Sequence, residues 1–503
     1  MKYRLICLAV VAVILAGGFV LQGDRSATKR YHQHLEERPY TPCSDHGDEV
    51  FCTHLPLFNI VTDVPIPEPF FQDEEGYHLM DENGNRIINN EMVTASVDFF
   101  VNPEGNNHLT DAPELSERAL IRFRGNSSRS FEKKSYLLKF TTADGSKNLD
   151  VPLDGMAADN SWVLHGPILD KTLIRNYLCY NITGEFMDYV PEVRFCELYL
   201  NGQYEGVYLL TEKINYNSEG RCKLTKTDPK LPQTSFLLRL DKESDDSLHS
   251  METFLDYNGK RGVSSRIGGH FEILYPSTTL TPEQKEYISS QISNLEKAMS
   301  SFDATDKKKG YAAYLDVDSF VDYFIFNEFC MNNDVGKLST YLCRDIRGKI
   351  TIIGWDYNNV FNNYSKDQLR NSEFIFSDIW YEYLFRDSSF VDKVVQRYRQ
   401  LRKGVLSDAY LENYIAQTIA YLGPAVQRNN TRWGYTFSWT YHVQNPDTAL
   451  DPLSRNPVTY QGAVDQLVSA IEKHGWFLDE NIEMLYSRSH ASVNKKYHYQ
   501  SGK

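Results

Sequence analysis

Hydrophobic and polar residues alternate along much of the chain between residues 55 and 215. A period of two is typical of β-strands that bury one face, so this part is predicted to be a β-rich N-terminal lobe. An Asn-Gly pair at Asn201 and Gly202 predicts one hairpin turn. The strands predicted in this way cover residues 93–101, 119–123, 136–140, 197–200 and 206–210. One predicted helix, over residues 171–186, interrupts them and has Asp170 as its N-cap.

Beyond residue 277 the hydrophobic residues recur every three or four positions, which is the period of an α-helix. The first helix is predicted to begin after Thr281, where Pro282 suits the first turn and Gln284 completes a capping box. Together these patterns predict an α+β fold with two lobes and a cleft between them. Its parts are a β-rich N-lobe (55–215), a connecting β segment (216–276) and a helical C-lobe (277–503).

The longest apolar run, Leu5 to Leu21, lies at the N-terminus and is preceded by Lys2 and Arg4. Basic residues on this side place the N-terminus inside and the body outside the cytoplasm. Because about 17 residues are just enough to span a membrane, residues 1–23 are predicted as a signal anchor, with a cleaved signal peptide as the alternative. We expect an extracytoplasmic body that is attached to a membrane by this segment, or secreted after cleavage, with residues 24–54 as a polar stalk.

Cys43 and Cys52 stand in the predicted stalk. In an oxidising compartment such a pair is predicted to form a disulfide. His46 and His54 belong to the same segment, so the alternative is a zinc site of two cysteines and two histidines. The disulfide, or two free thiols, is favoured over a metal site, because the spacing matches no familiar zinc finger.

Composition and charge narrow the classes of function. With 503 residues, 41% of them hydrophobic, the chain has enough apolar material for a large core, which argues against a disordered protein. The formal charge of −14 and the absence of a lysine or arginine block argue against nucleic acid as a partner. The sequence also lacks a phosphate-binding P-loop, a HExxH metal helix and a GxSxG nucleophile elbow.

Two aspartates flank a predicted β-hairpin in the C-lobe. Asp334 ends a polar loop after an apolar helix, and Asp356 directly follows the second of two short strands that turn at Arg347 and Gly348. This arrangement suits phosphoryl transfer, in which one aspartate orients the substrate hydroxyl and another holds magnesium on the phosphates. The alternative is that both are ordinary turn or capping residues.

Four groups of residues give the chain a resemblance to the CotH family, the spore-coat-type atypical protein kinases, over residues 55–400. The groups are 124–128 (RGNSS) with 133–136 (KKSY), 162–164 (WVL) with 170–176 (DKTLIRN), 197–208 (ELYLNGQYEGVY) with 211–213 (TEK), and the stretch from Asn333-Asp334 to Trp355-Asp356. The resemblance implies a two-lobed fold similar to protein kinases. It also implies ATP with Mg²⁺ or Mn²⁺ as cofactors, and Ser/Thr phosphorylation of exported proteins.

The resemblance assigns roles to the two aspartates. Asp334 matches the family's catalytic aspartate, and Asp356 matches the aspartate that binds metal. The family also uses a lysine near the ATP phosphates, for which Lys134 fits the motif better than Lys139. These lysines lie five positions apart on one strand and therefore on opposite faces, so only one of them faces the cleft.

Further cofactor contacts are expected around these residues. The loop from Gly125 to Ser130, which contains Asn126 and Ser127 and has Arg124 nearby, suits phosphate binding, although a plain hairpin turn has the same appearance. Glu212 ends the strand that leads toward the second lobe, which suits either the cleft or the surface. The second metal ligand is Ser339, which stands where an ordinary kinase has asparagine, or Asn358 or Asn359.

The predicted function is that of an extracytoplasmic, membrane-attached protein kinase. One alternative is a surface or coat scaffold that keeps the fold without turnover. The other is a carbohydrate-associated surface module, suggested by 33 tyrosines and 6 tryptophans.

Overall fold

The structure is a computed structural model that describes residues 30–490, with internal gaps. The gaps are residues 44–50, 82–83, 85, 126, 217–221, 223, 242–248, 258–269, 333, 335, 337, 364–369, 377 and 439–455. The predicted signal anchor or signal peptide, 1–23, therefore lies outside the described residues. Among the residues that are described, no helix combines the length and the hydrophobicity needed to cross a membrane.

The N-terminal lobe is a closed barrel of seven strands. The strands are β1 (Leu57–Thr62), β2 (Val93–Phe100), β3 (Leu115–Arg124), β4 (Ser135–Thr141), β5 (Ser161–His165), β6 (Val193–Leu200) and β7 (Gln203–Glu212). They are joined in the order β1-β2-β3-β4-β5-β7-β6, and β1 and β6 pair in parallel to close the barrel. The predicted strands are confirmed, because alternate residues such as Ile121, Leu138 and Leu198 fill the interior.

A five-stranded sheet forms the centre of the second lobe. Its strands are β8 (Phe236–Asp241), β9 (Ser250–Met251), β10 (His270–Tyr275), β11 (Thr340–Arg344) and β12 (Thr351–Ile353), in the order β12-β11-β8-β10-β9. The predicted connecting β segment, 216–276, contains β8, β9 and β10. These strands join the predicted hairpin in one sheet, in which the buried Leu238 of β8 pairs with the buried Leu342 of β11.

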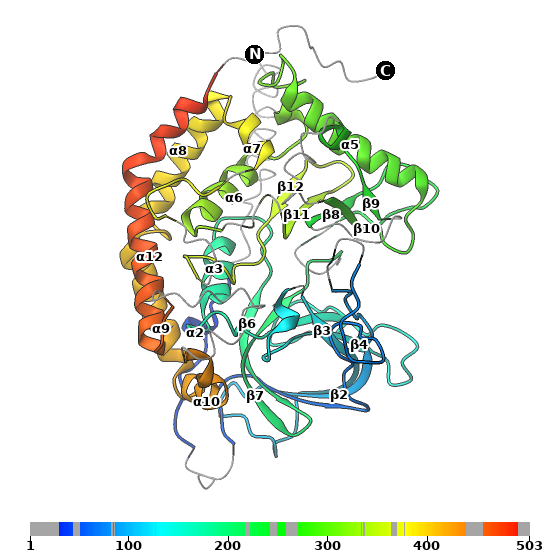
Figure 1. Ribbon diagram of the computed structural model, residues 1–503, viewed down its shortest axis with the longest axis vertical. Coiled ribbons are helices and arrows are strands. Elements are labelled where there is room, and N and C mark those ends of the chain that lie inside the picture. The colour runs from blue at the N-terminus through cyan, green and yellow to red at the C-terminus, as the bar shows by residue number, and fades with distance from the viewer. Residues whose placement is uncertain are drawn as a thin grey trace, which may run out of the picture.

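Helices surround this sheet and extend back to the barrel (Figure 1). The main ones are α3 (Arg175–Gly184), α5 (Pro282–Ser300), α6 (Val317–Phe329), α8 (Ser388–Arg402), α9 (Asp408–Leu422), α10 (Pro424–Trp433) and α12 (Tyr460–Asn481). Shorter ones are α4 (Phe254–Tyr257), α7 (Ile379–Leu384), η1 (Ser127–Ser130), η3 (Tyr311–Ala313), η4 (Gly434–Phe437) and η6 (Ile482–Arg488). The predicted capping box of α5 is confirmed, with reciprocal bonds between Thr281 and Gln284.

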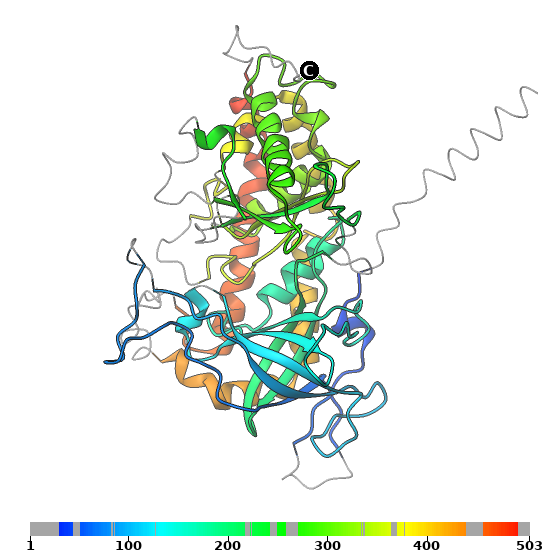
Figure 2. The ribbon, with the colours of Figure 1, turned by 90° about the vertical axis from the view of Figure 1, so that its right-hand side faces the viewer.

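The two lobes are stacked along the long axis of the molecule (Figure 2). One large core includes the helices of the second lobe, α3 and residues on the outer side of the barrel, among them Phe195 and Leu209. Helix α10 returns to β7, where Asn429 Oδ1 accepts hydrogen bonds from Val207 N at 3.2 Å and from Lys133 Nζ at 2.7 Å. The predicted lobes are therefore joined by a shared core and by a C-terminal helix.

The N-terminal arm, residues 30–43, packs against the body. Helix α2 (Gln33–Glu36) lies in this arm, and Gln33 exchanges two hydrogen bonds with the backbone of Phe195 in β6. Arg30 is only 2% exposed. The structure therefore corrects the predicted polar stalk for these residues. Polar side chains suggest solvent exposure in a sequence, but here they find hydrogen-bond partners in the interior.

We expect Arg30→Ala to lower the free energy of unfolding by roughly 3 kcal/mol, because it leaves buried acceptors without a charged donor. The Arg30 guanidinium donates to Asn181 Oδ1 and to the carbonyls of Val190 and Pro191. Urea unfolding of the variant and the parent protein measures the difference. Arg370→Ala is the control, because that side chain is 73% exposed. Equal stability of the Arg30 variant and the control would show that the arm is not held by this contact.

Candidate active site

The loop after β12 holds Asp356 in an uncommon backbone conformation. Its φ is +61°, in the left-handed region that residues other than glycine rarely adopt and that recurs at functional sites. Two side chains of helix α3 hold the backbone of this loop. Asp356 N donates to the Tyr180 hydroxyl at 3.2 Å, and Tyr357 N donates to the Asn176 side chain at 2.9 Å.

Asn332 connects this loop to the one that carries Asp334. Its amide nitrogen donates to the Asp356 carbonyl at 3.4 Å and to Asn327 Oδ1 of α6 at 3.1 Å. Its Oδ1 accepts from Asp334 N at 3.4 Å, and Asp334 is exposed, which leaves it accessible to a substrate. Asn332 was not predicted, because no local pattern in the sequence reveals that one amide bridges two loops.

Ser339 lies beside Asp356. Its hydroxyl donates to Asp356 Oδ2 at 3.2 Å. Its φ of +49° is also in the left-handed region. The structure thus brings together the two residues that the sequence analysis named as first and second metal ligands.

Neighbouring charges control the ionisation of Asp356. Burial raises the pKa of its carboxyl to about 6; Arg124 counteracts this rise, whereas Asp334 and Asp241 add to it. Asp241, the last residue of β8, was not predicted, because its strand was assigned to a connecting segment. Several carboxylates that repel one another around one position form an arrangement that a bound cation stabilises.

The barrel contributes positive charge to the same region. Arg124 ends β3, and its guanidinium lies over the Trp355 ring at 5.8 Å from the centroid. Desolvation lowers the pKa of Lys213, which follows β7, and the charges of Arg122, Lys139 and Arg124 lower it further. Four cations are therefore gathered on the outer face of the barrel, with Arg124 reaching the residue that precedes Asp356.

The Lys134 side chain makes its contacts within the N-lobe. Its Nζ donates to the Arg129 carbonyl in η1 at 2.6 Å and lies over the Phe123 ring. Lys139 instead lies close enough to Lys213 to lower its pKa, as Arg124 also does. Of the two lysines, Lys139 is therefore the one that shares the neighbour Lys213 with Arg124.

The predicted phosphate loop is a tight turn. Gly125 has a φ of +98°, and a Cβ atom there would meet Ser128 Oγ at 1.9 Å, so only glycine fits. Ser127 begins η1. Asn126 and the side chain of Ser127 lie outside the described residues, and their contact with phosphate stays a prediction.

The remaining three predicted residues, Glu212, Asn358 and Asn359, make different contacts. Glu212 accepts a hydrogen bond from Glu192 N at 2.7 Å through its side chain, which links the end of β7 to the start of β6. The Asn358 carbonyl accepts from the side chain of Asn363 at 2.8 Å. The Asn359 side-chain oxygen is buried and has no hydrogen-bond partner among the described residues. Of these two asparagines, Asn359 therefore offers an unused acceptor three residues after Asp356.

Residues 121–478 match the protein family described as CotH kinase protein. This match covers well over half of the chain and includes Arg124, Asp334 and Asp356. The chain belongs to the CotH family. A CotH-family relative is the inner spore coat protein H of Bacillus subtilis (strain 168). It is 24% identical over 324 residues, which are 59% of this chain and 80% of that protein.

Membership in the CotH family confirms the resemblance found in the sequence. The matched region begins within β3, so it takes in most of the barrel, the sheet of the second lobe and the helices through α12. The family description refers to a kinase, whereas the Bacillus subtilis relative is named as a coat protein.

Proposed function

We propose that this CotH-family protein is an extracytoplasmic kinase that transfers the γ-phosphate of ATP to serine or threonine hydroxyls of exported proteins. The observation that carries the proposal is the pairing of Asp356 with Ser339 beside the exposed Asp334, opposite Arg124 of the barrel. Phosphoryl transfer requires such a combination of metal-binding oxygens, an aspartate for the hydroxyl and positive charge for the phosphates.

The oxygen atoms present fit a magnesium ion. Mg²⁺ prefers carboxylate and other oxygen ligands and usually binds through one or two carboxylates together with substrate phosphates. Asp356 and Ser339 would hold it, and Asp241 adds negative charge nearby. When bound, the ion would neutralise charge on the β- and γ-phosphates.

The cations of the barrel would bind the phosphates of ATP. Arg124 and Arg122 form no ion pair with a carboxylate in the part of the chain that the structure describes; Arg122 donates to Asn90 Oδ1 and to the Phe123 carbonyl. Guanidinium groups without a protein carboxylate are suited to phosphate oxygens, to which they donate bidentate hydrogen bonds. Lys139 would add a further charge on the same face.

Asp334 would orient the hydroxyl of the protein substrate. It is exposed, and Asn332 ties its backbone to the Asp356 loop. An aspartate in this position accepts the hydroxyl proton as the phosphoryl group is transferred.

The test of the proposal is a transfer assay with γ-labelled ATP, a protein acceptor and Mg²⁺ or Mn²⁺. We expect labelled phosphoserine or phosphothreonine that disappears when the metal is chelated. Nucleotide binding without transfer to any acceptor, including the protein itself, would instead support the coat scaffold.

The name of the Bacillus subtilis relative, an inner spore coat protein, favours the coat scaffold as the second candidate. The carbohydrate-associated module has no such support. Of the tryptophans that the structure describes, four are buried and only Trp476, at 65%, is well exposed.

We expect the affinity for Mn²⁺ to fall as the pH drops below about 6. The folded-state pKa of Asp356 is raised to about 6 by burial, and a carboxylate must lose its proton to bind metal. Affinity should be constant above pH 7 and about tenfold lower at pH 5. Electron paramagnetic resonance of Mn²⁺ binding in the absence of ATP measures this pH dependence. Protonation of the ATP phosphates then does not contribute to the result.

Asp334→Asn provides the control for this pH dependence. The negative charge of Asp334 raises the pKa of Asp356, so its removal should move the midpoint to lower pH. A midpoint that stays in place, or an affinity that does not depend on pH between 5 and 7, would contradict the assignment of Asp356 as the metal ligand.

A further inference from the structure

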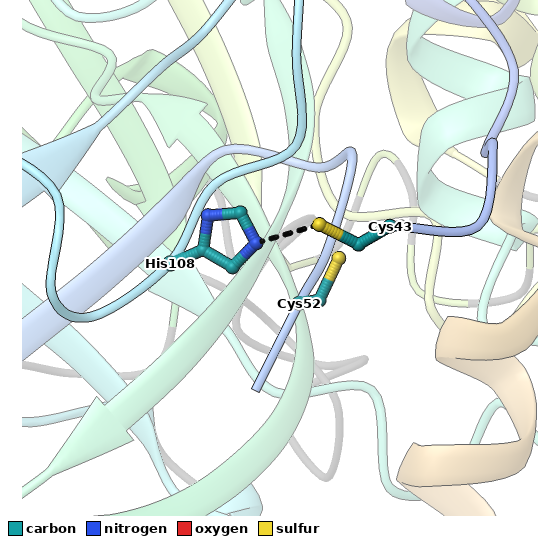
Figure 3. A group of neighbouring side chains, drawn as sticks. All are labelled: Cys43, Cys52 and His108. Carbon is teal, nitrogen blue, oxygen red and sulfur yellow. Dashed lines mark hydrogen bonds between the residues drawn. The ribbon is translucent and has the colours of Figure 1, made fainter. Parts of the chain in front are cut away.

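A second cluster of metal-binding atoms lies apart from the aspartates. Cys43 ends the N-terminal arm, Cys52 directly precedes Thr53, and His108 belongs to the connection between β2 and β3. The two sulfur atoms and one ring nitrogen lie within 4.8 Å of one another, and Cys43 Sγ is 3.3 Å from His108 Nε2 (Figure 3). His108 is buried, and both cysteines are half-buried free thiols.

The other ring nitrogen of His108 faces a carboxylate. His108 Nδ1 lies 3.1 Å from Asp111 Oδ2, which also accepts from His108 N at 2.8 Å. A carboxylate at Nδ1 favours the tautomer that carries its proton there, so the lone pair of Nε2 faces the thiols. Histidines that bind metal commonly have this second partner, which fixes the ring and increases the basicity of the ligand nitrogen.

Asn106 supports the sulfur of Cys52. Its amide nitrogen donates to Cys52 Sγ at 3.0 Å and to the Thr41 carbonyl at 2.8 Å. Arg38 Nη2 donates to the Asn106 side-chain oxygen at 3.3 Å, which orients the amide. A donor aimed at sulfur stabilises the thiolate, which is the form that binds metal.

We propose that Cys43, Cys52 and His108 bind one thiophilic divalent cation of the zinc class. Two thiolates and one imidazole are a ligand set that Zn²⁺ uses, and the fourth tetrahedral position is left for water or another ligand. Binding releases the two thiol protons to solvent, so a +2 ion and two thiolates give a neutral site. The ion would join the N-terminal arm to the β2–β3 connection.

This site differs from both sequence-based hypotheses for the two cysteines. His54 is not a member of this cluster, and its Nε2 lies 2.6 Å from the Tyr421 carbonyl. His46 lies outside the described residues. The predicted disulfide would oxidise the same two sulfurs and is therefore mutually exclusive with the metal. His108, which lies 56 positions beyond Cys52, was not considered, because only the tertiary structure brings it to the cysteines.

The test begins with the full-length protein, purified without chelator or reductant. We expect about one equivalent of zinc per chain by elemental analysis. After exchange, Co²⁺ should give the thiolate-to-metal charge-transfer band and the visible absorption of a tetrahedral site. A Cys43–Cys52 disulfide in the purified protein, or the absence of a thiolate–Co²⁺ band after Co²⁺ is added to the reduced protein, would overturn the proposal.

Variants assign the ligands. Cys52→Ser and His108→Gln should lose the charge-transfer band or lower its intensity, whereas Cys343→Ser should keep it. Cys343 is a matched control, because it neighbours Cys222 as Cys43 neighbours Cys52 but belongs to the second lobe. Asp111→Asn should lower the zinc affinity about 10–100-fold, measured by competition with a chromophoric chelator. Unchanged affinity in His108→Gln, or equal loss in Cys343→Ser, would refute the assignment.

Discussion

Asp334→Asn is expected to slow phosphate transfer by about 10²–10⁴-fold, which is the usual contribution of a general base, while nucleotide still binds. The substitution keeps the size of the side chain but removes the charge that orients the substrate hydroxyl. The backbone contact between Asp334 N and Asn332 does not depend on the carboxylate, so the loop should keep its conformation.

Asp356→Ala is expected to lower nucleotide binding as well as phosphate transfer, unlike Asp334→Asn. It removes the carboxylate that accepts the Ser339 hydroxyl and that would hold magnesium, so metal-dependent nucleotide binding and transfer should both fall. The backbone of the loop is held by Tyr180 and Asn176 through main-chain groups, so folding should persist.

The two variants are compared with the parent protein by melting temperature, nucleotide affinity and transfer rate. Asp318→Asn is a suitable control, because it removes an aspartate charge whose side chain is 78% exposed at the start of α6. If both site variants keep full transfer activity, or lose it only in proportion to folded protein, the roles of Asp334 and Asp356 are wrong. The scaffold function would then be the better explanation.

Asp170→Asn is expected to lower the free energy of unfolding by about 3–5 kcal/mol, because it leaves a buried arginine without its counter-charge. Asp170 and Arg175 form a salt bridge at 2.6 Å with side chains only 2% and 1% exposed. Asp170 also accepts from the backbone nitrogens of Thr172 and Arg175 at the start of α3. The family motif that contains Asp170, residues 170–176, therefore has a structural role. It leads into α3, and α3 positions the loop that carries Asp356.

Urea unfolding followed by circular dichroism measures this effect. Asp63→Asn is the matched control, because it removes the aspartate of an Arg–Asp pair with Arg118 that lies on the surface, with the Asp63 side chain 52% exposed. Surface pairs contribute little to stability, so the control should unfold like the parent protein. A small effect of Asp170→Asn would show that Arg175 finds another partner and that α3 does not depend on the pair.

Sequence by itself determined the features of this protein that depend on neighbouring residues. The alternation in β3 and β4, the Asn201-Gly202 turn and the capping box of α5 all appear where they were predicted. The hairpin between Asp334 and Asp356 was also predicted, because each strand and its turn have local signals. These patterns, and the motifs shared with the CotH family, were sufficient to identify the family.

Tertiary structure alone decided which distant segments meet. The parallel pairing of β1 with β6 closes the barrel, and β8 pairs with β11, about 100 residues later in the chain. Such pairings depend on how whole buried surfaces fit together, and no local periodicity encodes them.

The same reason explains the site residues that were missed. Asp241 reaches Asp356 only because β8 joins the sheet of β11, and Asn332 links two loops across the site. His108 meets Cys43 and Cys52 only because the N-terminal arm packs onto the barrel. Polarity along the chain suggested a solvated stalk there, but burial is decided by the partners that the folded chain supplies to each polar group.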